Sequence, residues 1–271
     1  MPFDIDQFSA LMAQFMVPFL RIAALFSVAP VLGHRNLPTN VRIALAAPVA
    51  IFVGGLLPPV GDLASYDPLS ISGFLFIAGQ IVIGLAIGFA FRMVFSALEI
   101  GGQVISMQMG LGFAEMTDPA SGARVPSLGH MYNILGTLVF LGLDGHLMLV
   151  QLLVDSFELL PIGQGTIAPI GARQLADWGV KMFQGAVMLA LPAIAALLAV
   201  NLAAGVMSRA VPQFNMMIAF PMILLLGLII LAVTVPQFFE HFEGMLTDIL
   251  TTLGTALGEP AAPSLGIDPN G

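Results

Sequence analysis

The sequence predicts an all-α membrane protein built from kinked hydrophobic helices and hairpins. Charged residues make up only 9% of the 271-residue chain, and hydrophobic residues make up 58%. Ordinary soluble domains carry about 25% charged residues, so this chain has too few polar groups to cover a soluble fold. Its apolar residues form long runs rather than the alternating pattern of an outer-membrane barrel. Because a segment in lipid must satisfy its own backbone, these runs are expected to be helices.

The composition also excludes several classes of function. The chain has no cysteine, so it holds no disulfide or thiolate metal site, and its four histidines are scattered. We therefore expect no metal and no cofactor. The net charge of −8 argues against a nucleic-acid partner, which requires a basic face. The first residues, MPFDIDQF, contain no lysine or arginine, so we expect no cleavable signal peptide.

Six apolar stretches have roughly the 20 residues that a helix needs to cross a bilayer. The last two are the clearest, because no charge occurs from Met182 to Ser208 or from Ala210 to Phe239. The short turn between them predicts an antiparallel helical hairpin. The six stretches are Ser9–Leu32, Val41–Val60, Leu69–Leu98, Ser127–Val154, Met182–Met207 and Val211–Phe239.

Prolines and glycines inside these stretches predict kinks and close packing. Membrane helices tolerate an internal proline because neighbouring groups can satisfy the carbonyl that it frees. Gly84 and Gly88 form a small-xxx-small pair, which favours close approach of another helix. The prolines concerned are Pro18, Pro48, Pro192 and Pro221.

The segment MGLGFAEMTDPASGARVP, Met109 to Pro126, lies between two apolar stretches. A solvated loop is the simplest interpretation, but apolar residues such as Phe113 and Met116 continue into it. Glycine permits backbone shapes closed to other residues, and methionine packs against changing surfaces. Irregular backbone at membrane depth must be buried in protein or line a watery cavity, and an apolar constriction there can exclude ions by dewetting. A movable seal is therefore the second interpretation.

Enzyme chemistry is not predicted. Ser121 has no obvious base beside it, and Asp144 and His146 lie two residues apart, so on a helix they point to different faces. We interpret Asp144 and His146 as marking a helix end.

Arginines within the apolar stretches are a separate signal, because a lone arginine in lipid requires pairing, snorkelling or water. Arg92 and Glu99 are seven residues apart and share a helix face. The candidates for a buried ion pair or an interface are Arg21, Arg92 and Glu99, and an interfacial anchor is the alternative for Arg92.

Three stretches resemble one known family. The central block GLGFAEMTDPASGARVPSLGHMYNILGTLVFLGLDGHLMLVQLLVDSFELLPIG closely resembles the central region of the FliR family, membrane proteins of the bacterial flagellar type III export gate. FSVAPVLGHRNLPTNVRIALA resembles the family's first helix–loop–helix, and VPQFNMMIAFPMILLLGL resembles its closing hairpin. The resemblance extends from about Phe8 to Phe239.

The resemblance implies a structural, non-enzymatic subunit of a hetero-oligomeric helical assembly in the bacterial inner (cytoplasmic) membrane, at the flagellar basal body. Residues 1–178 would match the FliP fold, including a pore loop at about 106–124, and residues 179–250 the FliQ hairpin. Residues 251–271, rich in Gly, Pro and Ala, are expected to be a short helix end followed by a disordered tail. The partners implied are FliP-like and FliQ-like membrane subunits, an FlhB-like export switch protein, unfolded flagellar export substrates and the lipid membrane.

The resemblance also assigns the central segment a role as the plug of the export pore. In family assemblies the helices are bent and lifted from the membrane plane, so the six stretches need not all span it. The alternatives are the equivalent subunit of a virulence type III secretion system and a stand-alone small-solute transporter. The plug residues expected are Met107, Met109, Gly110, Gly112, Phe113, Glu115, Met116, Asp118, Pro119 and Gly122.

Overall fold

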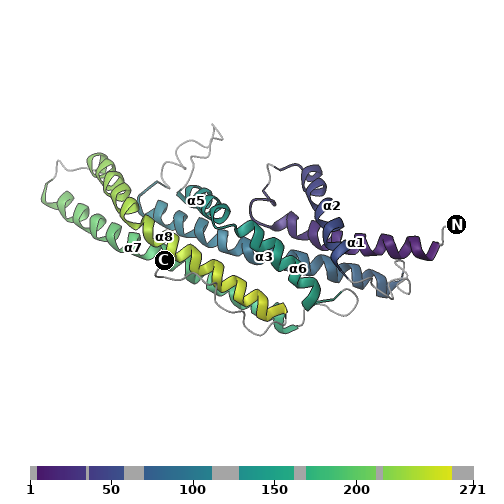
Figure 1. Cartoon of the computed structure of the whole chain (residues 1–271). Coiled ribbons are helices and arrows are strands. Elements are labelled where there is room, and N and C mark those ends of the chain that lie inside the picture. Colours follow the sequence, from purple (N-terminus) through teal and green to yellow (C-terminus); the bar gives the residue numbers. More distant parts are fainter. Residues whose placement is uncertain are drawn as a thin grey trace, which may run out of the picture. The chain divides into compact units, whose positions relative to one another are not determined.

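The computed structural model describes residues 5–34, 37–57, 70–111, 128–161, 169–211 and 216–257. Within these ranges all regular structure is helical, which confirms the all-α prediction (Figure 1). The helices are α1 (Ile5–Val28), α2 (Thr39–Leu56), α3 (Ile71–Gln108), α5 (Leu128–Gly142), α6 (Gly145–Leu159), α7 (Pro169–Ala210) and α8 (Met216–Leu257).

Three of the helices are much longer than the apolar stretches that predict them. α3 has 38 residues, and α7 and α8 have 42 each. At 1.5 Å per residue, a helix of this size is about 60 Å long, roughly twice the thickness of the hydrocarbon layer. Four helices of the described chain are long and apolar enough to cross a membrane, or five if α5 and α6 count as one broken span.

The stretch expected as one helix, Ser127–Val154, is two helices separated by a turn. Asp144 lies in this turn with a φ of 54°, in the left-handed region, and its carbonyl accepts the first N–H bonds of α6 at 2.8 Å and 3.1 Å. Asparagine and aspartate tolerate this conformation better than most residues. The interpretation of Asp144 as a helix end is confirmed, and the expected single span is replaced by a broken one.

The chain divides into two compact units. Unit 1 comprises residues 1–93, 141–178 and 247–271, and unit 2 comprises residues 94–140 and 179–246. Each unit contains one part of α3, one part of α7 and one part of α8. α7 runs without a break through position 178, where the FliP-like and FliQ-like parts were expected to meet.

In unit 1, glycine allows α1 and α3 to approach closely. A Cβ at Gly84 would collide with the carbonyl oxygen of Arg21. A Cβ at Gly88 would lie 2.9 Å from the carbonyl oxygen of Leu25. The small-xxx-small pair therefore packs against α1, as its spacing predicts. α2 is held to α1 by a 3.0 Å bond that the Gln14 side-chain amide donates to the Gly54 carbonyl.

Unit 2 has an aromatic core between α3, α5 and α8. The rings of Phe95 and Phe140 meet edge to face at 5.6 Å, and those of Phe95 and Phe242 at 5.7 Å. Tyr132 meets Phe238 in the same way at 5.0 Å. Such pairs contribute roughly 0.5–1.5 kcal/mol each beyond their burial. These contacts fix which face of α8 points inward.

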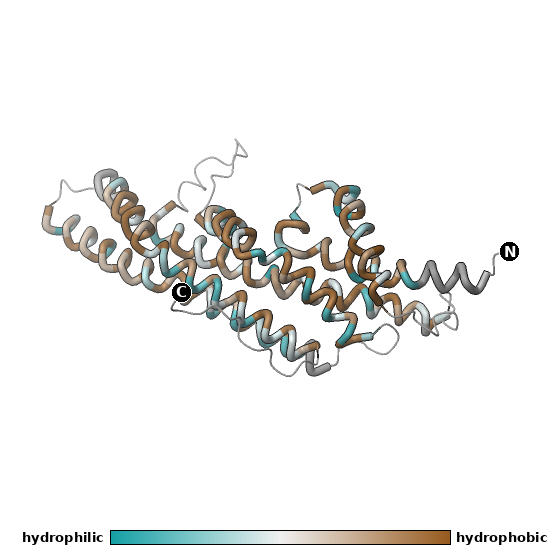
Figure 2. The backbone as a smooth tube through the Cα atoms, in the orientation of Figure 1, coloured by the Kyte–Doolittle hydropathy of each residue, from teal (hydrophilic) through white to brown (hydrophobic). Residues whose placement is uncertain are grey.

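Within unit 2, α7 and α8 form the antiparallel hairpin that the sequence predicts. His241 Nε2 lies 3.0 Å from the Gly185 carbonyl oxygen, and a Cβ at Gly185 would meet the Met245 sulfur at 2.7 Å. The hairpin is strongly apolar near its turn, and polar residues reappear along the second half of α8 (Figure 2). The helices contain the expected prolines and also Pro236.

The first residues of the expected C-terminal tail continue α8. Thr251 to Leu257 are helical, and residues 258–271 lie outside the described chain.

Candidate functional site

The segment that is predicted to form the plug begins at the end of α3, and Gly110 terminates this helix. Gly110 has a φ of +77°, a left-handed conformation that glycine adopts without a Cβ penalty. The Leu111 N–H donates to the Ser106 carbonyl at 3.1 Å, and the Gly110 N–H donates to the Met107 carbonyl at 3.1 Å. This pair of bonds is a Schellman motif, which terminates a helix sharply. α3 is thus stopped by a defined structure and does not simply fray.

The α7–α8 hairpin holds this helix end at two apolar contacts. Met109 is 4% exposed, and its side chain lies against Gly227 of α8, where an added Cβ would be 3.0 Å from Cγ and 3.1 Å from Sδ. The ring of Phe220, seven residues before Gly227 on α8, covers Gly110. A Cβ added at Gly110 would lie 3.2 Å from Cε2 of this ring. The absence of a side chain at Gly110 and Gly227 is therefore what allows the close fit.

α7 adds a polar contact at the same place. The Asn201 side-chain amide donates to the carbonyl oxygen of Gln108 at 3.3 Å. The last carbonyls of a helix have no partner within the helix, and the Schellman bonds use those of Ser106 and Met107. Asn201 satisfies the carbonyl that remains. We call the contacts of Met109, Gly110 and Gln108 with Phe220, Gly227 and Asn201 the α3 anchor.

Three of the expected plug residues can be placed. Met109 and Gly110 belong to the α3 anchor, whereas Met107 is 62% exposed and lies outside it. The other residues of the prediction lie outside the described residues: Gly112, Phe113, Glu115, Met116, Asp118, Pro119 and Gly122.

Arg21 lies in unit 1 and is fully buried, yet its partners are neutral oxygens rather than a carboxylate. Its Nε donates to Gln80 Oε1 at 2.9 Å. One terminal nitrogen donates to the carbonyl oxygen of Ser156 at 2.8 Å and to the hydroxyl of the same residue at 3.1 Å. The other terminal nitrogen donates to Gln80 Oε1 and, at 3.1 Å, to the Leu160 carbonyl. All five N–H donors of the guanidinium are used.

Two further features compensate the buried charge of Arg21. The carbonyls of Ser156 and Leu160 lie at the C-terminal end of α6, where the helix dipole favours a cation. The guanidinium carbon also lies 4.1 Å from the centre of the Phe157 ring, a cation–π contact. Arg21 therefore ties α1, α3 and the end of α6 together.

Arg92 and Glu99 are both exposed on α3. Among the residues that the structure describes, neither has an ion-pair partner. Nor does the described chain contain a group of three His, Asp or Glu side chains that could hold a metal ion.

Comparison with known proteins identifies the family. A family model described as bacterial export proteins, family 1, matches residues 12–249. The flagellar biosynthetic protein FliR of Pectobacterium carotovorum subsp. carotovorum is 37% identical over 252 residues, which cover 90% of this chain and 95% of the relative. The chain belongs to the FliR family. FliR of Escherichia coli (strain K12) is 36% identical, with 89% and 92% covered, and FliR of Bacillus subtilis (strain 168) is 29% identical, with 93% and 96% covered.

The FliR-family match includes the residues of the candidate site. The match to residues 12–249 includes Arg21, the α3 anchor and all but the last residues of the α7–α8 hairpin. The FliR resemblance expected from the central block is thus confirmed.

Sequence reasoning missed the partners of the α3 anchor in this FliR-family chain. Asn201 is an amide within the uncharged run of α7, and Gly227 interrupts a run of leucine and isoleucine in α8. Both are signals that could have been noticed. Neither says which residue of α3 it meets, because that depends on the packing of three helices.

Proposed function

We propose that this chain is a structural, non-catalytic subunit of the flagellar type III protein export gate in the bacterial cytoplasmic membrane. There it forms part of the pore, and of its plug, through which unfolded flagellar subunits pass. Support comes from FliR-family membership, from relatives named as flagellar biosynthetic proteins, and from four or five helices suited to a membrane.

The α3 anchor is the observation that best supports a plug. A plug must be attached firmly at its root so that it returns to the same place after a substrate has passed. α3 ends in a Schellman motif at Gly110, and α7 and α8 hold that end through Asn201, Gly227 and Phe220. Residues 112–124, which follow this root, would then supply the seal.

We further propose that the neighbours are FliP-like and FliQ-like membrane subunits and an FlhB-like export switch protein. In this proposal residues 1–178 take the place of a FliP-like subunit and residues 179–250 that of a FliQ-like hairpin. The hairpin of α7 and α8 in unit 2 is consistent with the second assignment.

Deletion of Gly110–Gly122 tests the plug. We expect assembly with the neighbouring subunits to persist, because Gly110 is the only deleted residue that belongs to the α3 anchor and the others follow it. We expect the cell membrane to leak ions. Ion permeability is measured in cells that express the gate, and assembly is measured by native mass spectrometry of the detergent-solubilised complex. Unchanged permeability in an assembled complex would remove the plug from the proposal.

The wild-type complex itself tests the proposal of a gate subunit. Purification of this chain with helical membrane partners in a fixed ratio is the expected result. An active, stable monomer that moves a small solute would contradict the proposal and favour the transporter alternative. Loss of a virulence secretion system, rather than of flagella, on deletion of the gene would favour the virulence equivalent.

A further inference from the structure

The turn between α1 and α2 in unit 1 contains a backbone conformation that its central residue disfavours. Val31 has a φ of 67°, in the left-handed region. This conformation is unusual for a β-branched residue, because the Cβ substituents crowd the backbone. The Leu32 N–H donates to the Pro30 carbonyl at 2.8 Å across Val31. A γ-turn with a positive central φ belongs to the rare, strained class, so Val31 raises the free energy of this turn.

The other left-handed residues of the described chain are of types that tolerate the conformation. They are Gly110 and Asp144, and each lies at a helix end. Glycine adopts a positive φ without penalty, and aspartate is enriched there. Val31 therefore differs from both, because a glycine or an asparagine in its place would form the same turn with less strain.

Neighbouring bonds hold the α1–α2 turn in this conformation. The Gly33 N–H donates to the Ala29 carbonyl at 2.7 Å, and a Cβ at Gly33 would lie 2.7 Å from the same oxygen. From α2, the Arg42 guanidinium donates to the His34 carbonyl at 2.7 Å. A strained backbone persists only where the surrounding structure imposes it. Arg42 is the part of this surrounding structure that belongs to the second helix.

The two helices that the turn joins are held very differently. α1 is fixed to α3 and α6 by the buried Arg21, and α3 approaches it closely at Gly84 and Gly88. By contrast, only 22% of the most apolar window of α2 is buried. The bond from the Gln14 side chain to the Gly54 carbonyl ties α2 to α1 away from the turn. α1 is thus the fixed side of the turn, and α2 is the weakly held side.

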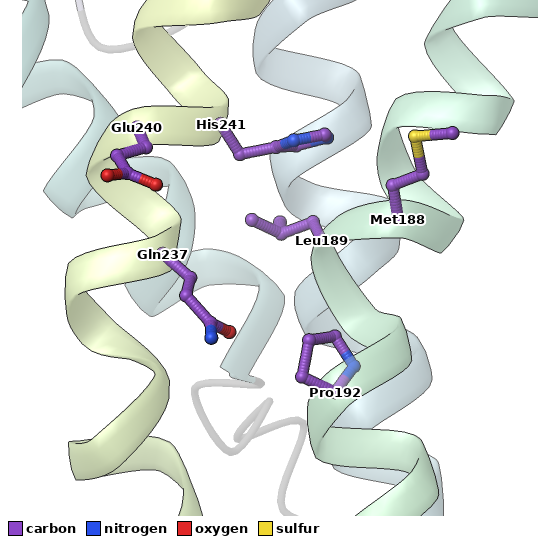
Figure 3. A pocket seen from close by; sticks show the side chains of 6 residues that line it. All are labelled: Met188, Leu189, Pro192, Gln237, Glu240 and His241. Carbon is purple, nitrogen blue, oxygen red and sulfur yellow. The ribbon is translucent and has the colours of Figure 1, made fainter.

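The α7–α8 hairpin of unit 2 offers a comparison. A pocket of about 440 Å³ lies between its helices, with Gln237 and His241 extending from α8 towards α7 (Figure 3). Pro192 of α7 also lines it, and a proline interrupts the bonding of a helix because it has no N–H. None of the residues that line the pocket has a left-handed φ. Backbone strain of the Val31 kind therefore occurs at the α1–α2 turn and not at this pocket.

We propose that the α1–α2 turn is a hinge that is strained in the observed arrangement, and that α2 has a second position in which Val31 takes a negative φ. When Arg42 releases the His34 carbonyl, the turn relaxes and α2 moves away from α1. Hinges are a few residues at element ends that absorb a change in φ and ψ, so neither helix has to unfold. The hinge uses only residues of this chain, and it does not depend on the proposed export role.

Distances between spin labels on α2 and α3 test for the second position. The chain has no cysteine, so the exposed Phe52 of α2 and Val82 of α3 can be changed to cysteine and labelled specifically. The full chain is purified from the membrane with any subunits that it retains. Double electron–electron resonance should show two distances when the turn is wild type, one for the observed arrangement and one for the second position.

Variants of Val31 should shift the two populations in a known direction. Val31→Gly and Val31→Asn relieve the strain of the observed arrangement, so the second population should fall by roughly fivefold or more. Asparagine is included because glycine also loosens the unfolded chain. Val31→Ile is the matched control, since isoleucine is also β-branched and should leave the distances as in the wild type. The unfolding temperature should rise in the Gly and Asn variants.

Arg42→Met should have the opposite effect, because it removes the bond to the His34 carbonyl, and the second population should increase. Arg92→Met is its control, since Arg92 is an exposed arginine of α3 in the same unit. A single distance with the wild-type turn would overturn the hinge, as would an unchanged distribution in both Val31→Gly and Val31→Asn. A lower unfolding temperature in both would show that Val31 is not strained and would also overturn it. An unchanged distribution in Arg42→Met would overturn the role of Arg42.

Discussion

Arg21 shows how one charged side chain is accommodated in an apolar chain. A buried guanidinium is stabilised only when its donors are satisfied and its charge is compensated. Here five donated bonds, the end of α6 and the Phe157 ring provide both, without a carboxylate. The side chain that looked like half of an ion pair is the centre of a hydrogen-bonded junction of three helices.

We expect Arg21→Met to destabilise the protein by about 3 kcal/mol or more, because it removes the donors of Gln80 Oε1 and of the Leu160 carbonyl and one of the two donors of the Ser156 carbonyl. The measurement is the thermal unfolding temperature of the purified protein in detergent. Arg173→Met is the control, since Arg173 is an exposed arginine of α7. Equal losses in the two variants would mean that the Arg21 bonds contribute little.

At the scale of helices, glycine decides where two elements can touch. The end of α3, which is the root of the proposed plug, depends on the fit of Met109 against Gly227, a contact that any larger residue on α8 would prevent. α3 and the hairpin are therefore coupled, so a change confined to α8 should act on the end of α3.

Gly227→Leu should displace Met109, loosen the α3 anchor and raise the ion permeability of the membrane. We expect the gate still to assemble, because the aromatic contacts of Phe238 and Phe242 lie elsewhere on α8. Ion permeability of cells that express the variant is the measurement. Gly205→Leu on α7 is the matched control, since an added Cβ there meets nothing within 4 Å. A similar leak in both variants would show that the anchor is not the cause.

For the whole molecule, the exposed apolar surface implies dependence on neighbours. Only 17% of the most apolar window of α8 and 28% of that of α7 is buried within the chain. The rest must be covered by lipid, detergent or other subunits.

We expect co-expression with FliP-like and FliQ-like subunits to raise the unfolding temperature of the chain in detergent by several degrees or more, because partners that bind only the folded state stabilise it. Thermal unfolding of the chain alone and of the complex gives the comparison. An identical unfolding temperature would indicate that lipid or detergent covers these faces equally well.

The sequence by itself determined the class of protein, the approximate place of most helices and the family. These depend on local or averaged properties: the scarcity of charge, long apolar runs, and a central block whose length makes chance resemblance small. The sequence also indicated a break near Met109–Pro126, because glycine and proline limit helices wherever they occur. It did not reveal that α3 runs to Gln108, since that part of the chain is neither fully apolar nor interrupted.

Only the tertiary structure decided which residues meet. Arg21 could be paired with Gln80, Ser156 and Leu160 only once α1, α3 and α6 were placed together, and those residues are 59 to 139 positions away. The same holds for Asn201 and Gln108, which are 93 positions apart. The periodicity of a helix shows which of its faces is apolar, but a specific contact depends on the distance and angle between two helices, and these result from the packing of all their side chains.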